Sequence, residues 1–164
     1  MNALNKAEVG KYINDHFVSS FQKVATFRIA DGQKQGGNVA SYFCTPDNRV
    51  LHIIAGPVNA ATMLRESRWV VEAYKLALLE SANNPTRFAE LIRQAHADRL
   101  RREHRLNVAF PDHRNSRPAL NNQGRVHLLL AAAPLVKVEQ VYRLVFEKIL
   151  GEQVSTGPVV ENNE

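Results

Sequence analysis

The strongest constraint on the fold is a pair of short apolar runs separated by a turn, within NVASYFCTPDNRVLHIIAGP (residues 38–57). Pro46 suits the second position of a type I turn, and Asn48 belongs to a residue type that tolerates a left-handed backbone. Residues 39–45 and 49–55 are therefore predicted to pair as an antiparallel hairpin.

Alternation along the hairpin assigns its side chains to two faces. One face carries Ala40, Tyr42 and Cys44, and the other carries Val39, Ser41 and Phe43. Since both faces are largely apolar, we expect helices to cover the hairpin on at least one side.

Apolar residues at helical spacing predict the elements around the hairpin. The expected helices span about 6–16, 59–80, 85–105 and 138–149, and a strand is expected over 22–30. Asn84 is the expected cap of the third of these helices. The run RVHLLLAAA (125–133) is ambiguous between a helix and a buried strand, and its leucine and alanine content favours a helix.

Composition limits the class of protein. The 164 residues, with 45% hydrophobic and 23% charged side chains, suit one soluble domain with a helical extension. No apolar run approaches the roughly 20 residues that span a bilayer, so no membrane association is expected. A single cysteine excludes an internal disulfide and fits a reducing cytoplasm, with an exported mature form as the alternative.

Two stretches resemble bacterial thioredoxin-related proteins. NKAEVGKYINDHFV (5–18) is similar to the helix that follows their Cys-x-x-Cys, and GGNVASYFCTPDNRVLHIIAG (36–56) resembles their closing hairpin. The resemblance implies a three-layer thioredoxin-like α/β fold for residues 1–82. Residues 83–151 would form a helical extension packed on that core, and 152–164 a flexible tail.

The chain departs from this family at the residues that carry its chemistry. Thioredoxin-like catalysis uses a cysteine pair at a helix N-terminus, where one thiol has a lowered pKa. Only MNAL (1–4) precedes the matching helix, so the cysteine pair and the strand before it are missing and the fold is N-terminally incomplete. Either the 22–30 strand pairs differently, or another chain fills the resulting sheet edge, or Met1 is a boundary within a longer parent that carries the Cys-x-x-Cys.

Cys44 is the sole redox candidate. The hairpin alternation places its thiol beside Tyr42, away from the family's catalytic position. A structural role as a small apolar side chain is the favoured interpretation. A regulatory or intermolecular thiol is the alternative.

The spacing of the histidines in the sequence indicates no metal site, and no cofactor is expected. They are His16, His52, His96, His104, His113 and His127. His96 and His104 lie two turns apart on one predicted helix, too far to share a metal directly. HExxH and CxxC patterns are absent, and one cysteine cannot build a thiolate zinc site.

Arginine is concentrated in residues 87–117, which hold eight arginines, no lysine and four acidic residues. The candidate basic patch consists of Arg99, Arg101, Arg102 and Arg105. Such a patch could bind a polyanion through counterion release. However, Asp98 and Glu103 interleave with the arginines and no stacking aromatics accompany them, so nucleic acid is not the expected partner.

The function expected from the sequence is therefore non-catalytic. No Ser-His-acid arrangement or phosphate loop supports an enzyme. We interpret the chain as a protein-interaction or structural module, with a protein partner or a homodimer. A thiol–disulfide role through Cys44 or a longer parent, and polyanion binding through the arginines, are the alternatives.

Overall fold

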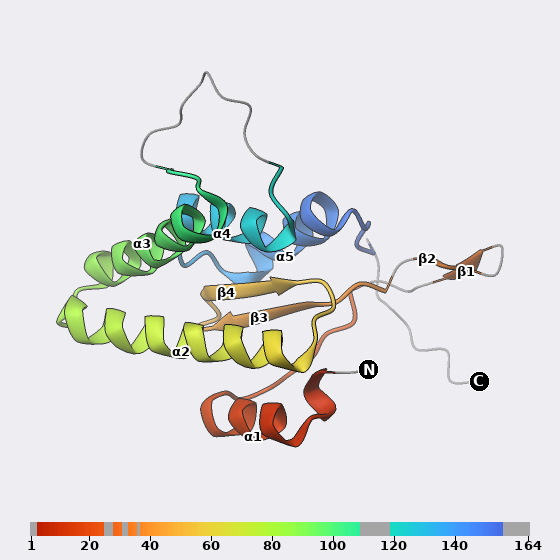
Figure 1. Ribbon diagram of the computed structural model, residues 1–164, viewed down its shortest axis with the longest axis horizontal. Coiled ribbons are helices and arrows are strands. Elements are labelled where there is room, and N and C mark those ends of the chain that lie inside the picture. The colour runs from red at the N-terminus through yellow and green to blue at the C-terminus, as the bar shows by residue number, and fades with distance from the viewer. Residues whose placement is uncertain (1–2, 25–27, 31–32, 36, 109–118, 156–164) are drawn as a thin grey trace.

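The computed structural model describes residues 3–24, 28–30, 33–35, 37–108 and 119–155, and over this part the chain is a mixed α/β protein (Figure 1). The helices are the short turn η1 (Ala3–Asn5), α1 (Ala7–His16), α2 (Ala60–Ser81), α3 (Pro85–His104), α4 (Asn122–Ala132), α5 (Val138–Leu144) and the π-helical turn η2 (Val145–Leu150). The strands are β1 (Arg28–Ala30), β2 (Gln33–Gln35), β3 (Ala40–Cys44) and β4 (Val50–Ala55). All the predicted helices are present, and the ambiguous 125–133 run is helical.

The predicted hairpin is confirmed. β3 and β4 pair antiparallel, and the connecting turn is closed by the Thr45 amide donating to the carbonyl of Arg49 over 2.8 Å. Asn48 has φ of 62°, which is the left-handed conformation expected from its residue type.

An irregularity in the hairpin register sets which residues share a face. Phe43 lies opposite His52, but Cys44 lies opposite Val50, so Leu51 is the additional residue of a β-bulge. The bulge directs Val50 and its partner Cys44 to one core while Phe43 packs in the other.

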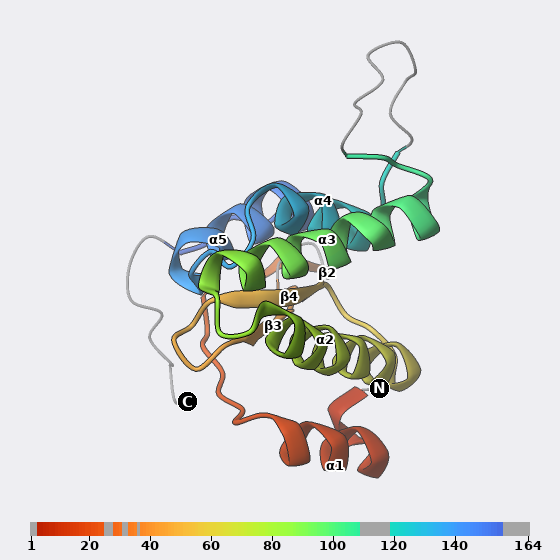
Figure 2. The ribbon, with the colours of Figure 1, turned by 90° about the vertical axis from the view of Figure 1, so that its left-hand side faces the viewer.

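Helices cover both faces of the β3–β4 pair (Figure 1, Figure 2). α1 and α2 lie on one side, α4 and α5 lie on the other, and α3 runs between α2 and α4. Every residue of β4 is buried, because this strand contributes to both cores. The first core includes Phe43, Leu51, Ile54, Met63, Leu64, Val70 and Ile92. The second includes Val50, Ile53, Val126, Leu130, Val141, Val145 and Ile149.

Asparagine side chains fix the starts of the three helices that surround β4. Asn59 accepts from the Thr62 amide at α2, and Asn84 accepts from the Arg87 amide at α3. Asn121 accepts from the Gly124 amide over 2.8 Å, so α4 begins three residues before the predicted run. These caps satisfy amides that the first helical turn leaves unpaired.

The structure differs from expectation at two places. A strand is predicted over residues 22–30, and within that range the structure describes only the short strand β1. β1 pairs with β2 and not with the hairpin, and residues 25–27 lie outside the described part of the chain. In the predicted tail, Glu152 accepts from the Asn38 amide and Val154 is buried, so these residues pack against the domain. Residues 156–164 lie outside the described part of the chain.

Candidate metal centre

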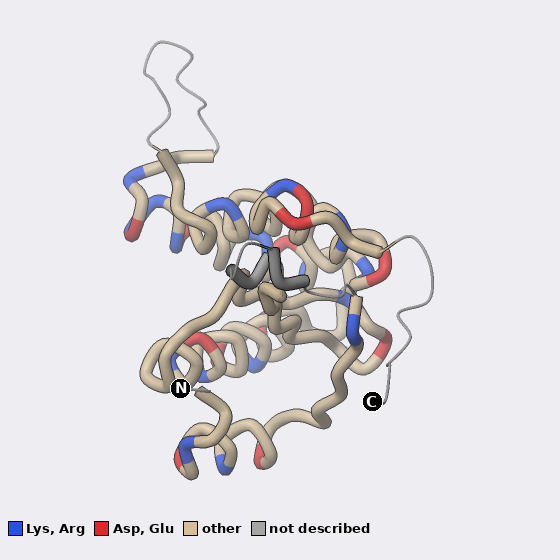
Figure 3. Tube along the Cα trace, turned by 90° about the vertical axis from the view of Figure 1, so that its right-hand side faces the viewer, with Lys and Arg blue, Asp and Glu red and all other residues tan. Residues whose placement is uncertain are grey.

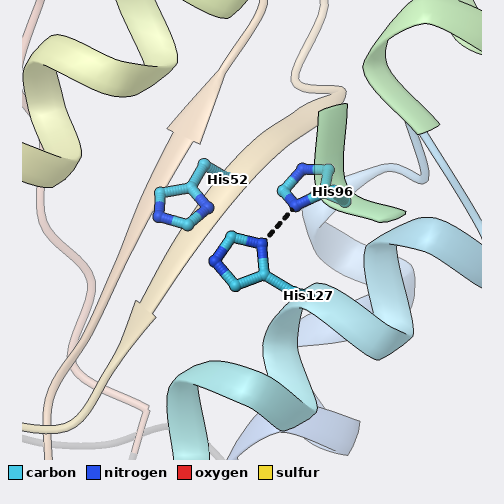
Figure 4. Close-up of side chains that lie close together, drawn as sticks. All are labelled: His52, His96 and His127. Atoms are coloured by element: carbon cyan, nitrogen blue, oxygen red, sulfur yellow. Dashed lines mark hydrogen bonds between the residues drawn. The ribbon is translucent and has the colours of Figure 1, made fainter. Parts of the chain in front are cut away.

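Three histidines from three different elements face one another in the interior (Figure 4). His52 comes from β4, His96 from α3 and His127 from α4, and each side chain is fully buried. Their ring centroids are 5.0–5.7 Å apart. One nitrogen of each ring can be chosen so that the three atoms lie within 4.8 Å of one another.

The local sequence pattern places each ring in the interior. His96 lies four residues after Ile92 and four before Leu100, so all three share the buried side of α3. His127 lies three residues before Leu130 on the buried side of α4. These helical faces converge on the fully buried strand that carries His52.

The hydrogen bonds of His96 define which nitrogen carries the proton in His96 and in His127. His96 Nε2 is 2.9 Å from the carbonyl oxygen of Leu51, which can only accept, so Nε2 carries the proton. His96 Nδ1 therefore has a free lone pair and accepts from His127 Nδ1 over 2.7 Å. The remaining nitrogen, His127 Nε2, has no partner among the described residues although it is buried.

His52 is oriented by a buried carboxylate. Its Nε2 is 3.0 Å from Oε2 of Glu66, so Nε2 donates and the other nitrogen, Nδ1, is unprotonated. Within the described part of the chain, His52 Nδ1 also lacks a partner. Two buried imidazole nitrogens with free lone pairs thus lie in the same cluster. Buried polar atoms without partners are uncommon in folded proteins, and each calls for an explanation.

A network of ion pairs surrounds Glu66. Arg99 donates from Nη1 to Glu66 Oε2 over 2.5 Å, and Arg65 donates from Nε to Glu66 Oε1 over 3.1 Å. Arg99 also donates from Nε to Glu103 over 2.7 Å, and its Cζ lies 4.8 Å from the Trp69 ring centroid. Each buried charge is therefore paired, as stability requires.

The environment keeps the three imidazoles neutral. The pKa of His96 is lowered to about 3, mainly because the ring is buried and to a smaller extent because His52 lies nearby. Burial is also the main cause of the lowered pKa of His52 and His127. Burial alone would raise the pKa of Glu66, but hydrogen bonds from His52 and Arg99 hold it well below its usual range. Neutral imidazole is the form that binds metal ions.

Two of the three histidines, His52 and His96, have the partner pattern of metal-bound histidines. Metal-bound histidines use their second nitrogen to donate to a carboxylate or a backbone carbonyl, which fixes the ring and its tautomer. Here His52 donates to Glu66 and His96 donates to Leu51 O. Zinc nitrogen ligands at about 2.0–2.1 Å lie about 3.3 Å apart in a tetrahedral site, so ring movements of about 1 Å would close this site.

Cys44 lies outside this centre, on the other face of the hairpin. It packs with Tyr42 against the second core and is partly buried. Burial, together with the charge of Glu139, raises the pKa of the Cys44 thiol to about 11. At neutral pH the thiol is therefore protonated and a weak nucleophile.

We predict slow alkylation of Cys44. A rise in pKa from 9.0 to about 11 reduces the thiolate fraction about 100-fold near pH 8. Iodoacetamide should therefore modify the folded protein about 100-fold more slowly than it modifies the unfolded protein in urea. Mass spectrometry of timed samples measures both rates; equal rates would contradict the raised pKa.

The four candidate arginines do not form one surface. Arg99 is buried in the ion-pair network, whereas Arg101, Arg102 and Arg105 are exposed. Arg101 pairs with Asp98 over 2.8 Å. Figure 3 shows basic and acidic residues interleaved along α3.

Sequence reasoning missed the histidine centre because its members belong to separate elements. His96 and His127 are 31 residues apart in the chain. A usable signal was present: each histidine occupies a position that the hydrophobic pattern assigns to the interior.

Comparisons with known proteins identify no relative. A scan against protein-family models, a search of curated proteins and a search of solved structures each return no match. Among the helices that the structure describes, none combines the length and apolar character needed to cross a bilayer.

Proposed function

We propose that this chain binds one transition-metal ion through His52, His96 and His127. The observation that carries the proposal is the pair of buried, unpartnered nitrogens, His52 Nδ1 and His127 Nε2, in a cluster of neutral imidazoles. A metal ion would give His52 Nδ1 the partner that it lacks. Bound through Nε2, His127 would gain the partner that this nitrogen lacks, and His96 Nδ1 would join the ligand set by giving up its hydrogen bond from His127.

The ligand chemistry favours Zn²⁺, Co²⁺, Ni²⁺ or Cu²⁺. Imidazole nitrogen suits these ions, whereas Mg²⁺ and Ca²⁺ prefer oxygen ligands. The three ligands come from β4, α3 and α4, so a bound ion would link three elements of the domain. We therefore expect it to stabilise the folded state by an amount that grows with the logarithm of the metal concentration divided by the dissociation constant.

Trp69 offers a direct test. It is the only tryptophan, and its ring centroid lies 4.9 Å from that of His52 and 5.1 Å from that of His96. A paramagnetic ion in the centre would quench its fluorescence strongly. Titration of the metal-free protein with Co²⁺ should give saturable quenching with one ion per chain, and Mg²⁺ should give none.

A matched pair of variants separates the centre from surface histidines. His16 is exposed on α1, so His16→Gln should leave the Co²⁺ quenching curve unchanged. His96→Gln should shift the curve to at least about 100-fold higher Co²⁺, because loss even of outer-sphere partners weakens metal affinity 10- to 100-fold. The same curve for both variants would show that quenching arises elsewhere and would refute the proposal.

We also propose, as a second role, that the domain is a non-catalytic thioredoxin-like interaction module. The order α1, hairpin, Gly56-Pro57 and α2 supports this fold. Leu76 and Leu79 support an interaction surface, because they are 55% and 79% exposed and lie three residues apart on α2. The partner that we propose is a second copy of this chain.

Light scattering tests this second role. A homodimer should form in both the presence and the absence of reductant, and Leu76→Glu combined with Leu79→Glu should weaken the dimer. A dimer lost only on reduction would instead indicate a Cys44 disulfide. A monomer at all concentrations would contradict the dimer.

A further inference from the structure

We infer that a metal ion at the histidine centre takes a small anion as its fourth ligand. This inference rests on the proposed metal binding and concerns what completes the coordination sphere. It begins with the charge of the protein ligands. His52, His96 and His127 are neutral when they bind, so a divalent ion keeps its full charge of two in the interior.

Nearby acidic residues cannot supply the missing charge without breaking existing ion pairs. Glu66 is held by Arg99 and Arg65, and it contacts Nε2 of His52 rather than the free Nδ1. Glu103 is held by Arg99. The two carboxylates and two guanidiniums sum to zero, so the network provides no net negative charge to balance a metal.

The surroundings make an unbalanced charge costly. Trp69 packs edge-on against the rings of His52 and His96, and Phe43 stacks near His52 at 6.0 Å between centroids. An isolated charge among such apolar groups is strongly disfavoured. Three-histidine sites leave the fourth tetrahedral position open to an external ligand. An anion in that position lowers the net charge of the centre to one.

A surface depression indicates where the anion would enter. It has a volume of about 440 Å³, and its lining includes Arg65, Glu66 and Gln123. Gln123 connects this depression to the centre: it lines the depression, it lies one turn before His127 on α4, and its Nε2 is 3.3 Å from His52 Nε2. Gln123 also donates to Ile53 O over 3.1 Å, which holds it in place.

The full burial of the rings limits the anion to a small size. The side chains of all three histidines have no exposed surface, and Gln123 and Glu66 are the residues of the depression that contact His52. Arg65 lines the depression with a side chain that is 64% exposed and that pairs with Glu66 over 3.0 Å. The structure therefore favours a small monovalent anion such as azide or thiocyanate over a bulky carboxylate.

Cobalt-loaded protein tests the inference. The visible absorption bands of Co²⁺ report its ligands, and they should shift saturably when azide or thiocyanate is added. Benzoate at the same ionic strength should leave them unchanged. Gln123→Ala should admit azide faster in stopped-flow mixing, and Lys75→Gln, an exposed change elsewhere on α2, should not.

The outcomes separate the two proposals. If Co²⁺ gives no bands that depend on the three histidines, the metal site itself is refuted. If those bands form and azide does not change them, metal binding stands and the anion ligand is overturned. Suppose that azide does not shift the bands of the wild-type protein but does shift those of Glu66→Gln. That result would identify Glu66 as the fourth ligand and would overturn the anion ligand.

Discussion

Replacing Arg99 with methionine is expected to lower the free energy of unfolding by about 3–5 kcal/mol, because it leaves the buried Glu66 carboxylate without its main cation. The Arg99 side chain is only 7% exposed and holds two carboxylates, those of Glu66 and Glu103. Methionine preserves much of the side-chain volume beside Trp69. The expected loss of stability therefore reports the cost of the unpaired Glu66 carboxylate rather than the cost of a cavity.

Urea denaturation followed by circular dichroism measures this loss. Arg101→Met is the matched control, since Arg101 is exposed and pairs with Asp98 at the surface. It should change the free energy of unfolding by no more than about 0.5–1 kcal/mol. The double variant Glu66→Gln with Arg99→Met should recover part of the loss, because it removes the orphaned charge. Equal effects of Arg99→Met and Arg101→Met would contradict a buried network.

Replacing His127 with leucine is expected to separate metal binding from folding. In the metal-free protein His127 makes one side-chain hydrogen bond, to His96, and its Nε2 has no partner among the described residues. Leucine removes that unpartnered nitrogen but leaves His96 Nδ1 unsatisfied. These effects oppose each other, so stability in chelator should stay within about 1 kcal/mol of wild type.

The same variant should lose the stabilisation that metal provides. A ligand at 100 times its dissociation constant stabilises the folded state by about 2.7 kcal/mol, and wild type should show such a gain in Zn²⁺. His127→Leu should show no gain at the same Zn²⁺ concentration. Thermal unfolding with and without Zn²⁺ measures both values; an equal gain in the two proteins would place the zinc at another site.

Local sequence patterns were sufficient for most of the fold. The Pro46 and Asn48 turn specified the hairpin, and helical spacing specified α1, α2, α3 and α5, whereas leucine and alanine content favoured the helix at α4. Asn84 and Pro85 marked the start of α3, where the asparagine oxygen accepts from the Arg87 amide. These features depend on residues within a few positions of one another, which a single sequence displays directly.

The candidate site could not be predicted because it depends on contacts between distant segments. The sequence places Arg99 among exposed arginines, but its partner Glu66 lies 33 residues earlier in the chain. The neighbours of His96 are likewise His52 and His127, on other elements, rather than His104 on its own helix. The bulge at Leu51, which sets the faces of β4, leaves no signal in the apolar run.

The most direct test of the metal centre is the zinc content of the protein after equilibrium dialysis against buffered Zn²⁺. The account predicts one zinc ion per chain in wild type and in His16→Gln. It predicts none above background in a variant that carries both His52→Leu and His127→Leu, provided that circular dichroism confirms its fold. Wild-type protein that retains no more zinc than this folded double variant would contradict the account.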